Sequence, residues 1–109
     1  MRDGDVKITS VDMIIIALCR DYFRREDALI NKSVTKRTDT EYRYYNFKIF
    51  DATAEICGEK WAPVYIKEIG NKTGYAKSEL AFYSEVTYKN YKRMIIDNIA
   101  KKLHLIDDI

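Results

Sequence analysis

Residues 84–103, SEVTYKNYKRMIIDNIAKKL, decide the fold because they repeat apolar side chains at the spacing of an amphipathic helix. At 100° per residue, one face of that helix collects five large side chains, which we expect to be buried. They are Tyr88, Tyr91, Ile95, Ile99 and Leu103. Ser84 is placed as the N-cap and Glu85 lies in the first turn, where a hydroxyl and a carboxylate suit the free amides. The stretch therefore predicts a long final helix with one buried face.

The opposite side of this predicted helix is basic near its start. Lys89, Asn90 and Arg93 point away from the expected core, and Lys92 lies nearer the boundary. Residues 84–103 hold five basic and two acidic residues, although the whole chain has a formal charge of only +2. Lys and Arg at a helix start can reach phosphates and base edges when that helix enters a major groove. The cluster is therefore a candidate DNA-binding surface, with an ordinary solvated face as the alternative.

A first helix is expected over residues 10–31, with Ser10 as its N-cap. Its middle, MIIIALC at residues 13–19, is apolar nearly all round, so other helices or a second copy of the chain must cover it. A strand is the alternative for the three consecutive isoleucines. The flanking helical period and the lack of hairpin turn signals favour the helix.

A second helix is predicted between Thr38 and Gly58. Thr38 and Glu41 have the spacing of a capping box, and Gly58 is placed to end the helix. One stripe of this helix is apolar: Tyr42, Tyr45, Ile49, Ala52 and Ile56. The helices of residues 10–58 are expected to pack as an antiparallel pair.

Shorter elements are expected between this pair and the final helix. Pro63 suits the first turn of a third helix. Its predicted buried residues are Val64, Ile66 and Ile69. The sequence GNKTG at residues 70–74 predicts a break, and a fourth short helix is expected over residues 75–82.

Together these patterns predict an all-α fold of about five helices. A chain of 109 residues is long enough for one core and too short for two ordinary ones, so we expect a single helical domain. Its parts are a flexible arm at residues 1–9, the helical pair at residues 10–58 and a helix-turn-helix-like part at residues 62–109. Neither a secretory leader nor a membrane-spanning apolar run is evident, so a cytoplasmic protein without a membrane partner is expected.

Residues 78–103, SELAFYSEVTYKNYKRMIIDNIAKKL, resemble the end of the sigma-factor-like helix-turn-helix regulators of late transcription in phages and prophages of low-GC bacteria. That family has a turn before Ser-x-x-Thr-aromatic, then a Lys/Arg-rich stretch, then I-A-x-x-L. The matching residues here are Ser84, Thr87, Tyr88, Lys92, Arg93, Ile99, Ala100 and Leu103. The resemblance covers about a quarter of the chain. It implies a positioning helix at residues 77–82 and a recognition helix at residues 84–93.

Residues 87–91, TYKNY, also resemble a helix in the DNA-gripping arm of tyrosine recombinases. Either resemblance implies a DNA-binding role. We therefore predict a transcription regulator that binds double-stranded DNA through the helix starting at Ser84. The predicted DNA-binding residues are Lys77, Ser84, Thr87, Lys89, Asn90, Lys92 and Arg93.

The alternative is a non-enzymatic helical protein-interaction module, either a homodimer or an adaptor to a partner such as an RNA polymerase subunit. DNA binding requires a continuous positive surface at the start of the final helix, joined by Lys72 and Lys77. An adaptor instead predicts an exposed apolar patch at residues 14–22 and carboxylates that neutralise the basic residues.

Catalytic and metal-binding chemistry has little support in the sequence. His104 is the single histidine, and Cys, Asp and Glu residues are not clustered around it at ligand spacing. Cys19 and Cys57 lie within helical patterns and are expected to be buried, reduced thiols. We expect no enzyme activity, no metal and no cofactor.

Overall fold

The computed structural model describes residues 9–106, which form five α-helices and one short 3₁₀ helix. The elements are α1 (Ser10–Arg20), α2 (Tyr22–Ile30), α3 (Lys36–Cys57), α4 (Ala62–Asn71), η1 (Tyr75–Lys77) and α5 (Glu85–Lys102). The described part of the chain contains no strand, so the all-α prediction is confirmed. Residues 1–8 of the predicted flexible arm lie outside the described residues, whereas Thr9 is ordered as the N-cap of α1.

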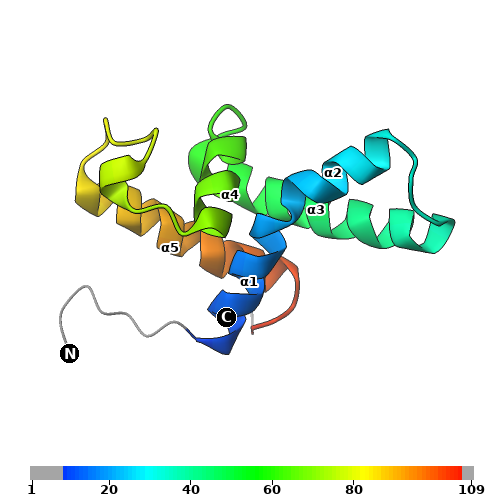
Figure 1. Cartoon of the computed structure of the whole chain (residues 1–109). Helices are drawn as coiled ribbons and strands as arrows, with labels where there is room; N and C mark the ends of the chain where they lie inside the picture. The colour runs from blue at the N-terminus through cyan, green and yellow to red at the C-terminus, as the bar shows by residue number, and fades with distance from the viewer. Residues whose placement is uncertain (1–8, 107–109) are drawn as a thin grey trace.

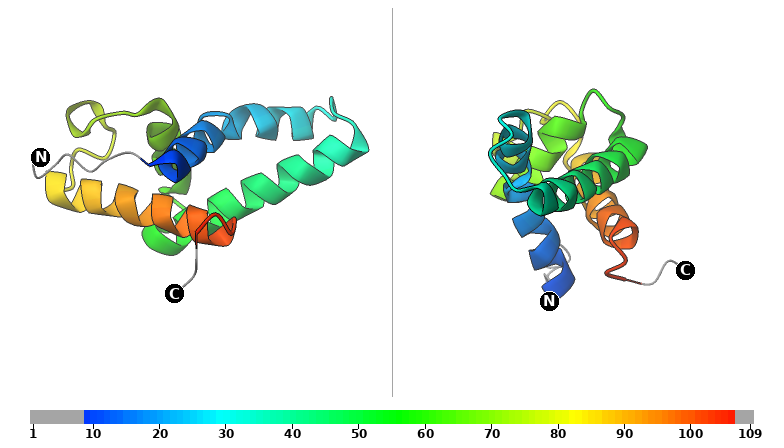
Figure 2. Two further views of the ribbon diagram at one scale, coloured as in Figure 1. Left: turned by 90° about the horizontal axis from the view of Figure 1, so that it is seen from below. Right: turned by 90° about the vertical axis from the view of Figure 1, so that its right-hand side faces the viewer.

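The molecule is elongated, with principal extents of 46 × 30 × 21 Å. α2 and α3 run antiparallel and project to one side as a hairpin, as Figures 1 and 2 show. α1 packs against α4 and α5, and α4 also contacts α3. The C-terminal half of α3 packs on α5, where Asn98 donates a hydrogen bond of 2.9 Å to the carbonyl of Ala52. None of the described helices combines the length and the apolar character needed to cross a membrane.

The single helix predicted over residues 10–31 is wrong, because the chain breaks at Asp21 into α1 and α2. Asp21 has a ψ of 3°, outside regular helical geometry. At the end of α1 the chain meets α4 so closely that a Cβ added to Gly70 would lie 2.5 Å from the Arg20 nitrogen. Because of the break, α1 packs on α4 and α5 whereas α2 packs on α3. The antiparallel pair predicted for residues 10–58 is therefore formed by α2 and α3 alone.

Both predicted N-caps of the first half shift toward the N-terminus. Thr9, and not Ser10, caps α1, and it forms a capping box with Asp12 in which each side chain accepts a hydrogen bond from the other's amide. Thr35 caps α3 one turn before the predicted Thr38 cap and accepts from the Thr38 amide. Gly58 ends α3 as predicted, with a φ of 85° that glycine adopts without strain.

The core lies where α1, α3, α4 and α5 meet. The expected buried face of α5 is confirmed, because Tyr88, Ile95 and Ile99 are buried while Tyr91 and Leu103 are half-buried. Sequence reasoning overlooked the largest core residue of α4, since Tyr65 is fully buried and stacks beside Tyr88 with ring centroids 6.1 Å apart. Other fully buried residues include Ile15, Ile49, Ile66, Ile69 and Leu80.

The helix predicted at residues 75–82, and with it the positioning helix at residues 77–82, is wrong. Only η1 is helical there, and turns follow it up to Ser84. Buried Glu68 holds this segment, because its carboxylate accepts hydrogen bonds from the Ser78 hydroxyl at 2.6 Å and the Glu79 amide at 2.9 Å. The Tyr75 hydroxyl lies 2.8 Å from the carbonyl oxygen of Ala81. The Glu68 carboxylate thus takes the Glu79 amide, which a helix over residues 75–82 would have paired with its own backbone.

Candidate nucleic-acid interface and neighbouring cleft

The start of α5 is capped as the sequence predicts. The Ser84 hydroxyl accepts a hydrogen bond of 3.1 Å from the Thr87 amide, and Glu85 occupies the first turn. The cap holds the first turn of α5 at one end of the molecule, far from the tip of the α2–α3 hairpin (Figure 1). Side chains of this first turn that point outward are therefore accessible to a large partner.

The structure divides the seven predicted DNA-binding residues between two surfaces. Four of them are exposed, and we call this set the helix-start face: Ser84, Lys89 and Asn90 at the start of α5, and Lys77 on η1, which contacts α5. Thr87 is half-buried beside them. Lys92 and Arg93 belong to a second surface, because they line a cleft between α5, α1 and the segment after α4.

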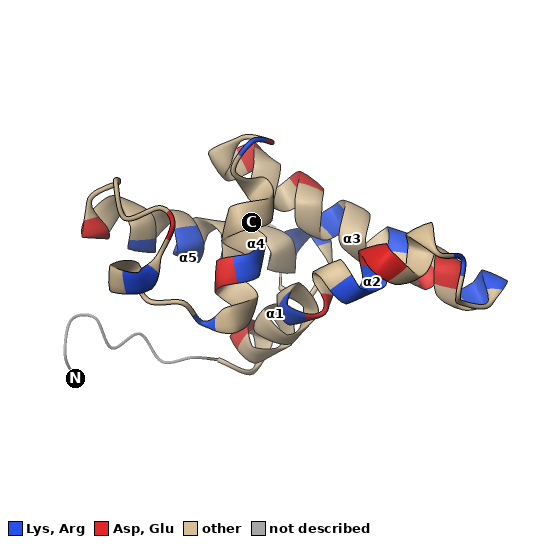
Figure 3. Cartoon of the chain, turned by 45° about the horizontal axis from the view of Figure 1, so that its top comes forward, with Lys and Arg blue, Asp and Glu red and all other residues tan. Residues whose placement is uncertain are grey.

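The charges of the helix-start face are weakly compensated. Lys89 forms an ion pair of 2.8 Å with Glu85, but both side chains are more than half exposed. Exposed pairs of this kind contribute about 0–1 kcal/mol, so Lys89 can exchange its partner for a phosphate at little cost. Within residues 9–106, no carboxylate lies at ion-pair distance from Lys72 or Lys77. Figure 3 shows basic residues on the first turns of α5 and on the segment leading into it, with acidic residues among them.

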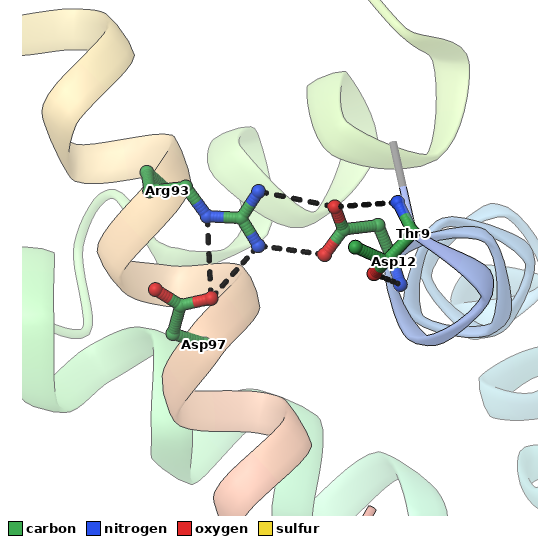
Figure 4. A network of polar contacts seen from close by, with 4 residues as sticks. All are labelled: Thr9, Asp12, Arg93 and Asp97. Carbon is green, nitrogen blue, oxygen red and sulfur yellow. Dashed lines mark hydrogen bonds and ion pairs between the residues drawn. The ribbon is translucent and has the colours of Figure 1, made fainter. Parts of the chain in front are cut away.

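Arg93 does not belong to the helix-start face, because its guanidinium is paired with the carboxylates of Asp12 and Asp97 (Figure 4). It donates two hydrogen bonds, of 2.6 and 3.1 Å, to the carboxylate of Asp12 on α1, and two more, of 2.8 and 3.2 Å, to Asp97. The Asp12 side chain is only 8% exposed. Hydrogen bonding to Arg93 holds the pKa of Asp12 below its ordinary value, and the same contact raises the pKa of Arg93. Arg93 therefore fastens α5 to the N-terminus of α1.

Lys92 is half-buried and has a different kind of partner. Its ammonium donates a hydrogen bond of 2.8 Å to the carbonyl oxygen of Thr73 and lies 5.0 Å from the centre of the Tyr88 ring. Burial lowers the pKa of Lys92, because desolvation disfavours the charged form. Lys92 thus ties the segment after α4 to α5 through a neutral acceptor.

The cleft that Lys92 and Arg93 line has a volume of about 300 Å³. Its polar wall also includes Lys72, Thr73, Gly74 and Asp12, and its apolar residues are Ile16, Ile69 and Ile96. The sequence placed Lys72 beside the basic cluster, but it gave no signal that α1 would complete the wall. That arrangement depends on the break at Asp21 and on the close approach of α1 to α4.

A second concave surface lies between α1, α3 and the residues after α5. This groove, which we call the apolar groove, has a volume of about 290 Å³. It is lined by Ile14, Leu18, Tyr44, Tyr45, Leu103 and Leu105. Ile14 is 46% exposed, whereas Tyr22 at the other end of the predicted apolar patch is buried. The exposed patch therefore occupies only the first part of residues 14–22 and continues across α3.

Neither thiol of the described residues is activated, and these residues form no cluster of metal ligands. Burial raises the pKa of the Cys19 thiol to about 12 and that of the Cys57 thiol to about 11, so both stay protonated at neutral pH. Among residues 9–106, no three His, Cys, Asp or Glu side chains gather closely enough to hold a metal ion.

Comparisons with known proteins return no match. No protein-family model matches the sequence, and the same holds for curated proteins and for solved structures.

Proposed function

We propose that the chain is a non-enzymatic, double-stranded DNA-binding protein that acts in transcriptional control in the cytoplasm, with the helix-start face as its DNA contact. The observation that carries this proposal is the Ser84-capped start of α5, on which Lys89 and Asn90 are exposed, together with exposed Lys77 on η1, which contacts α5. Free amides at a helix start favour a phosphate oxygen, and lysines beside them add charge.

Base recognition has suitable side chains on the same face. Asn90 is exposed, and an Asn amide can form paired hydrogen bonds with adenine in the major groove. Val86, one turn earlier, is 69% exposed and can contact a thymine methyl group. Arg93 is left out of the proposed contact because its ion pairs with Asp12 and Asp97 would have to break.

The test is fluorescence anisotropy with labelled random-sequence duplex DNA at several salt concentrations. We compare the wild type with a Lys77→Gln/Lys89→Gln variant and with a matched control, Lys36→Gln/Arg37→Gln. The two variants are matched. Each removes one lysine, Lys77 or Lys36, that has no ion pair among residues 9–106. Each also removes one exposed cation that is paired four residues away along its helix, Lys89 with Glu85 or Arg37 with Glu41. The control residues lie at the tip of the α2–α3 hairpin.

Each neutralised phosphate contributes about −0.9 to the slope of log affinity against log salt concentration. We expect the Lys77→Gln/Lys89→Gln variant to lose about two units of that slope and the control to lose less than one. Absence of binding at low salt by the folded wild type, or equal losses in both variants, would reject the proposal.

A second candidate function is protein binding at the apolar groove, with a second copy of the chain as the occupant tested first. The observation that favours it is the apolar lining that three parts of the fold contribute, with Ile14 46% exposed within it. Sedimentation velocity over a concentration series measures self-association. We expect Ile14→Asn to abolish it and Ile30→Asn, an exposed isoleucine outside the groove, to leave it unchanged. A wild type that stays monomeric throughout would exclude the dimer, and the groove would then be tested against an RNA polymerase subunit.

A further inference from the structure

The cleft between α1, α5 and the segment after α4 combines a cationic wall with an apolar floor. Lys72, Lys92 and Arg93 supply the cations, and Asp12 is the single carboxylate among the lining residues. Ile16, Ile69 and Ile96 supply the floor. A volume of about 300 Å³ is at the lower end of the range for small-molecule sites, and it is too small to admit a duplex.

The charges in this cleft are unevenly compensated. Both oxygens of Asp12 accept hydrogen bonds from Arg93, and Arg93 is also paired with Asp97, so these groups satisfy one another. Lys72 has no carboxylate within ion-pair distance among residues 9–106. Lys92 is half-buried, and within residues 9–106 the Thr73 carbonyl is its only hydrogen-bond partner. The cleft therefore holds two lysines that an anion would compensate.

The buried carboxylate of Glu68 does not fill this role. Glu68 acts on Lys92 at long range, but its two oxygens accept hydrogen bonds from Ser78, Glu79 and Tyr88. A half-desolvated ammonium next to a neutral acceptor is stabilised by an anion, because the attraction grows as water is excluded.

We infer that this cleft binds a small amphipathic anion, with a phosphate or carboxylate head on Lys72 and Lys92 and an apolar body on Ile16, Ile69 and Ile96. Inorganic phosphate alone leaves the isoleucine floor uncovered, and a neutral hydrocarbon leaves the two lysines uncompensated. The ligand therefore needs both parts in one molecule. This inference does not rest on the proposed DNA contact, which uses the helix-start face.

The experiment uses three probes on the isotope-labelled full chain, with backbone amide shifts as the readout. Octyl phosphate carries both parts of the expected ligand, inorganic phosphate carries the head alone and 1-octanol carries the body alone. We expect saturable shifts centred on Gly74, Lys92 and Ile96 with octyl phosphate, and at least tenfold weaker binding of the other two probes.

The variants are Lys72→Gln and Lys92→Gln, with Lys36→Gln as the matched control on an exposed helix start. We expect each cleft variant to weaken octyl phosphate binding at least fivefold and the control to leave it unchanged. Lys72 is exposed, so we expect Lys72→Gln to keep the fold intact. This variant therefore still tests the inference if Lys92→Gln disturbs the fold. Equal affinity for octyl phosphate and 1-octanol, shifts confined to the apolar groove, or unchanged affinity in Lys72→Gln would overturn the inference.

A membrane lipid and a free metabolite can both carry an anionic head and an apolar body. A pelleting assay with phosphatidylglycerol vesicles distinguishes these two sources of the ligand. If the wild type pellets with the vesicles and Lys72→Gln does not, the anion is a lipid headgroup. If the wild type binds octyl phosphate but does not pellet, the anion is a soluble molecule. Loss of DNA binding in Lys77→Gln/Lys89→Gln with octyl phosphate binding intact would show that the two surfaces are independent.

Discussion

Arg93 is the residue whose role depends most on side-chain geometry. Its planar guanidinium reaches both oxygens of Asp12 and one oxygen of Asp97, which a lysine ammonium cannot do with the same paired geometry. The ion pair joins residues 81 positions apart in sequence. Its strength depends on burial, since Asp12 is nearly inaccessible while Arg93 keeps about a third of its surface exposed.

We expect Arg93→Met to lower the free energy of unfolding by about 2 kcal/mol, because it leaves a buried carboxylate without its cation. Urea denaturation followed by circular dichroism at neutral pH measures the change. Lys89→Met, which removes an exposed ion pair on the same helix, should cost less than about 0.5 kcal/mol. A loss in Arg93→Met no larger than in this control would show that the interhelical pair contributes little.

The lowered pKa of Asp12 makes this contribution depend on pH. In the unfolded chain an aspartate titrates near 3.9, and in the folded chain hydrogen bonding to Arg93 brings the pKa below that value. The stabilisation is therefore fully present above about pH 4 and is lost as pH falls through the lowered folded-state pKa. Urea denaturation at pH 5 and pH 3 should show a smaller acid-induced loss in Asp12→Asn than in the wild type. Parallel losses in both proteins would contradict this assignment.

At the scale of secondary-structure elements, the approach of α1 to α4 depends on Gly70. A Cβ at this position would meet backbone atoms of Arg20 and Cys19 at 2.5 to 2.8 Å, and backbone cannot move aside as a flexible side chain can. We expect Gly70→Ala to destabilise the fold by at least about 2 kcal/mol, although alanine normally favours a helix. Gly74→Ala is the control, because a Cβ there meets nothing within 4 Å. Thermal unfolding of both variants decides the point.

The sequence predicted the elements whose formation depends on their own period. α3 and α5 each bury one stripe, so the spacing of Ile49 and Ala52, or of Ile95 and Ile99, was enough to locate them. The break at Asp21 and the non-helical segment before Ser84 depend on contacts between segments. Gly70 supplies one of these contacts, and Glu68 and Tyr75 supply the others. No local pattern contains that information.

The same distinction explains the candidate surfaces. The cap at Ser84 and the exposure of Lys89 and Asn90 follow from helical period and were predicted correctly. The engagement of Arg93 depends on Asp12, which the sequence indicated only as a first-turn acid of a distant helix. The cleft and the apolar groove required the packing of three separate parts of the chain.

At the scale of the whole molecule, the α2–α3 hairpin should open more readily than the rest. Its base is held by buried Arg25, which donates a hydrogen bond of 2.7 Å to Asn46, and by Asn46, which donates to the Tyr22 carbonyl at 3.0 Å. Beyond this base α2 packs mainly on α3, and Ile30 is exposed. We expect amide hydrogens of residues 26–42 to exchange at least tenfold faster than those of residues 88–100, as measured by mass spectrometry. Uniform exchange would mean that the hairpin unfolds with the core.

The distance between the hairpin tip and the start of α5 makes residues 31–35 a suitable attachment point for a reporter dye. A Ser33→Cys substitution would place a reactive thiol there, far from the helix-start face. The native thiols compete poorly for a maleimide, because Cys19 is buried and the raised pKa of Cys57, about 11, keeps it protonated. The fluorescence anisotropy of the singly labelled protein would then report the slower tumbling on binding DNA or a partner protein. Neither the helix-start face nor the apolar groove would be chemically changed.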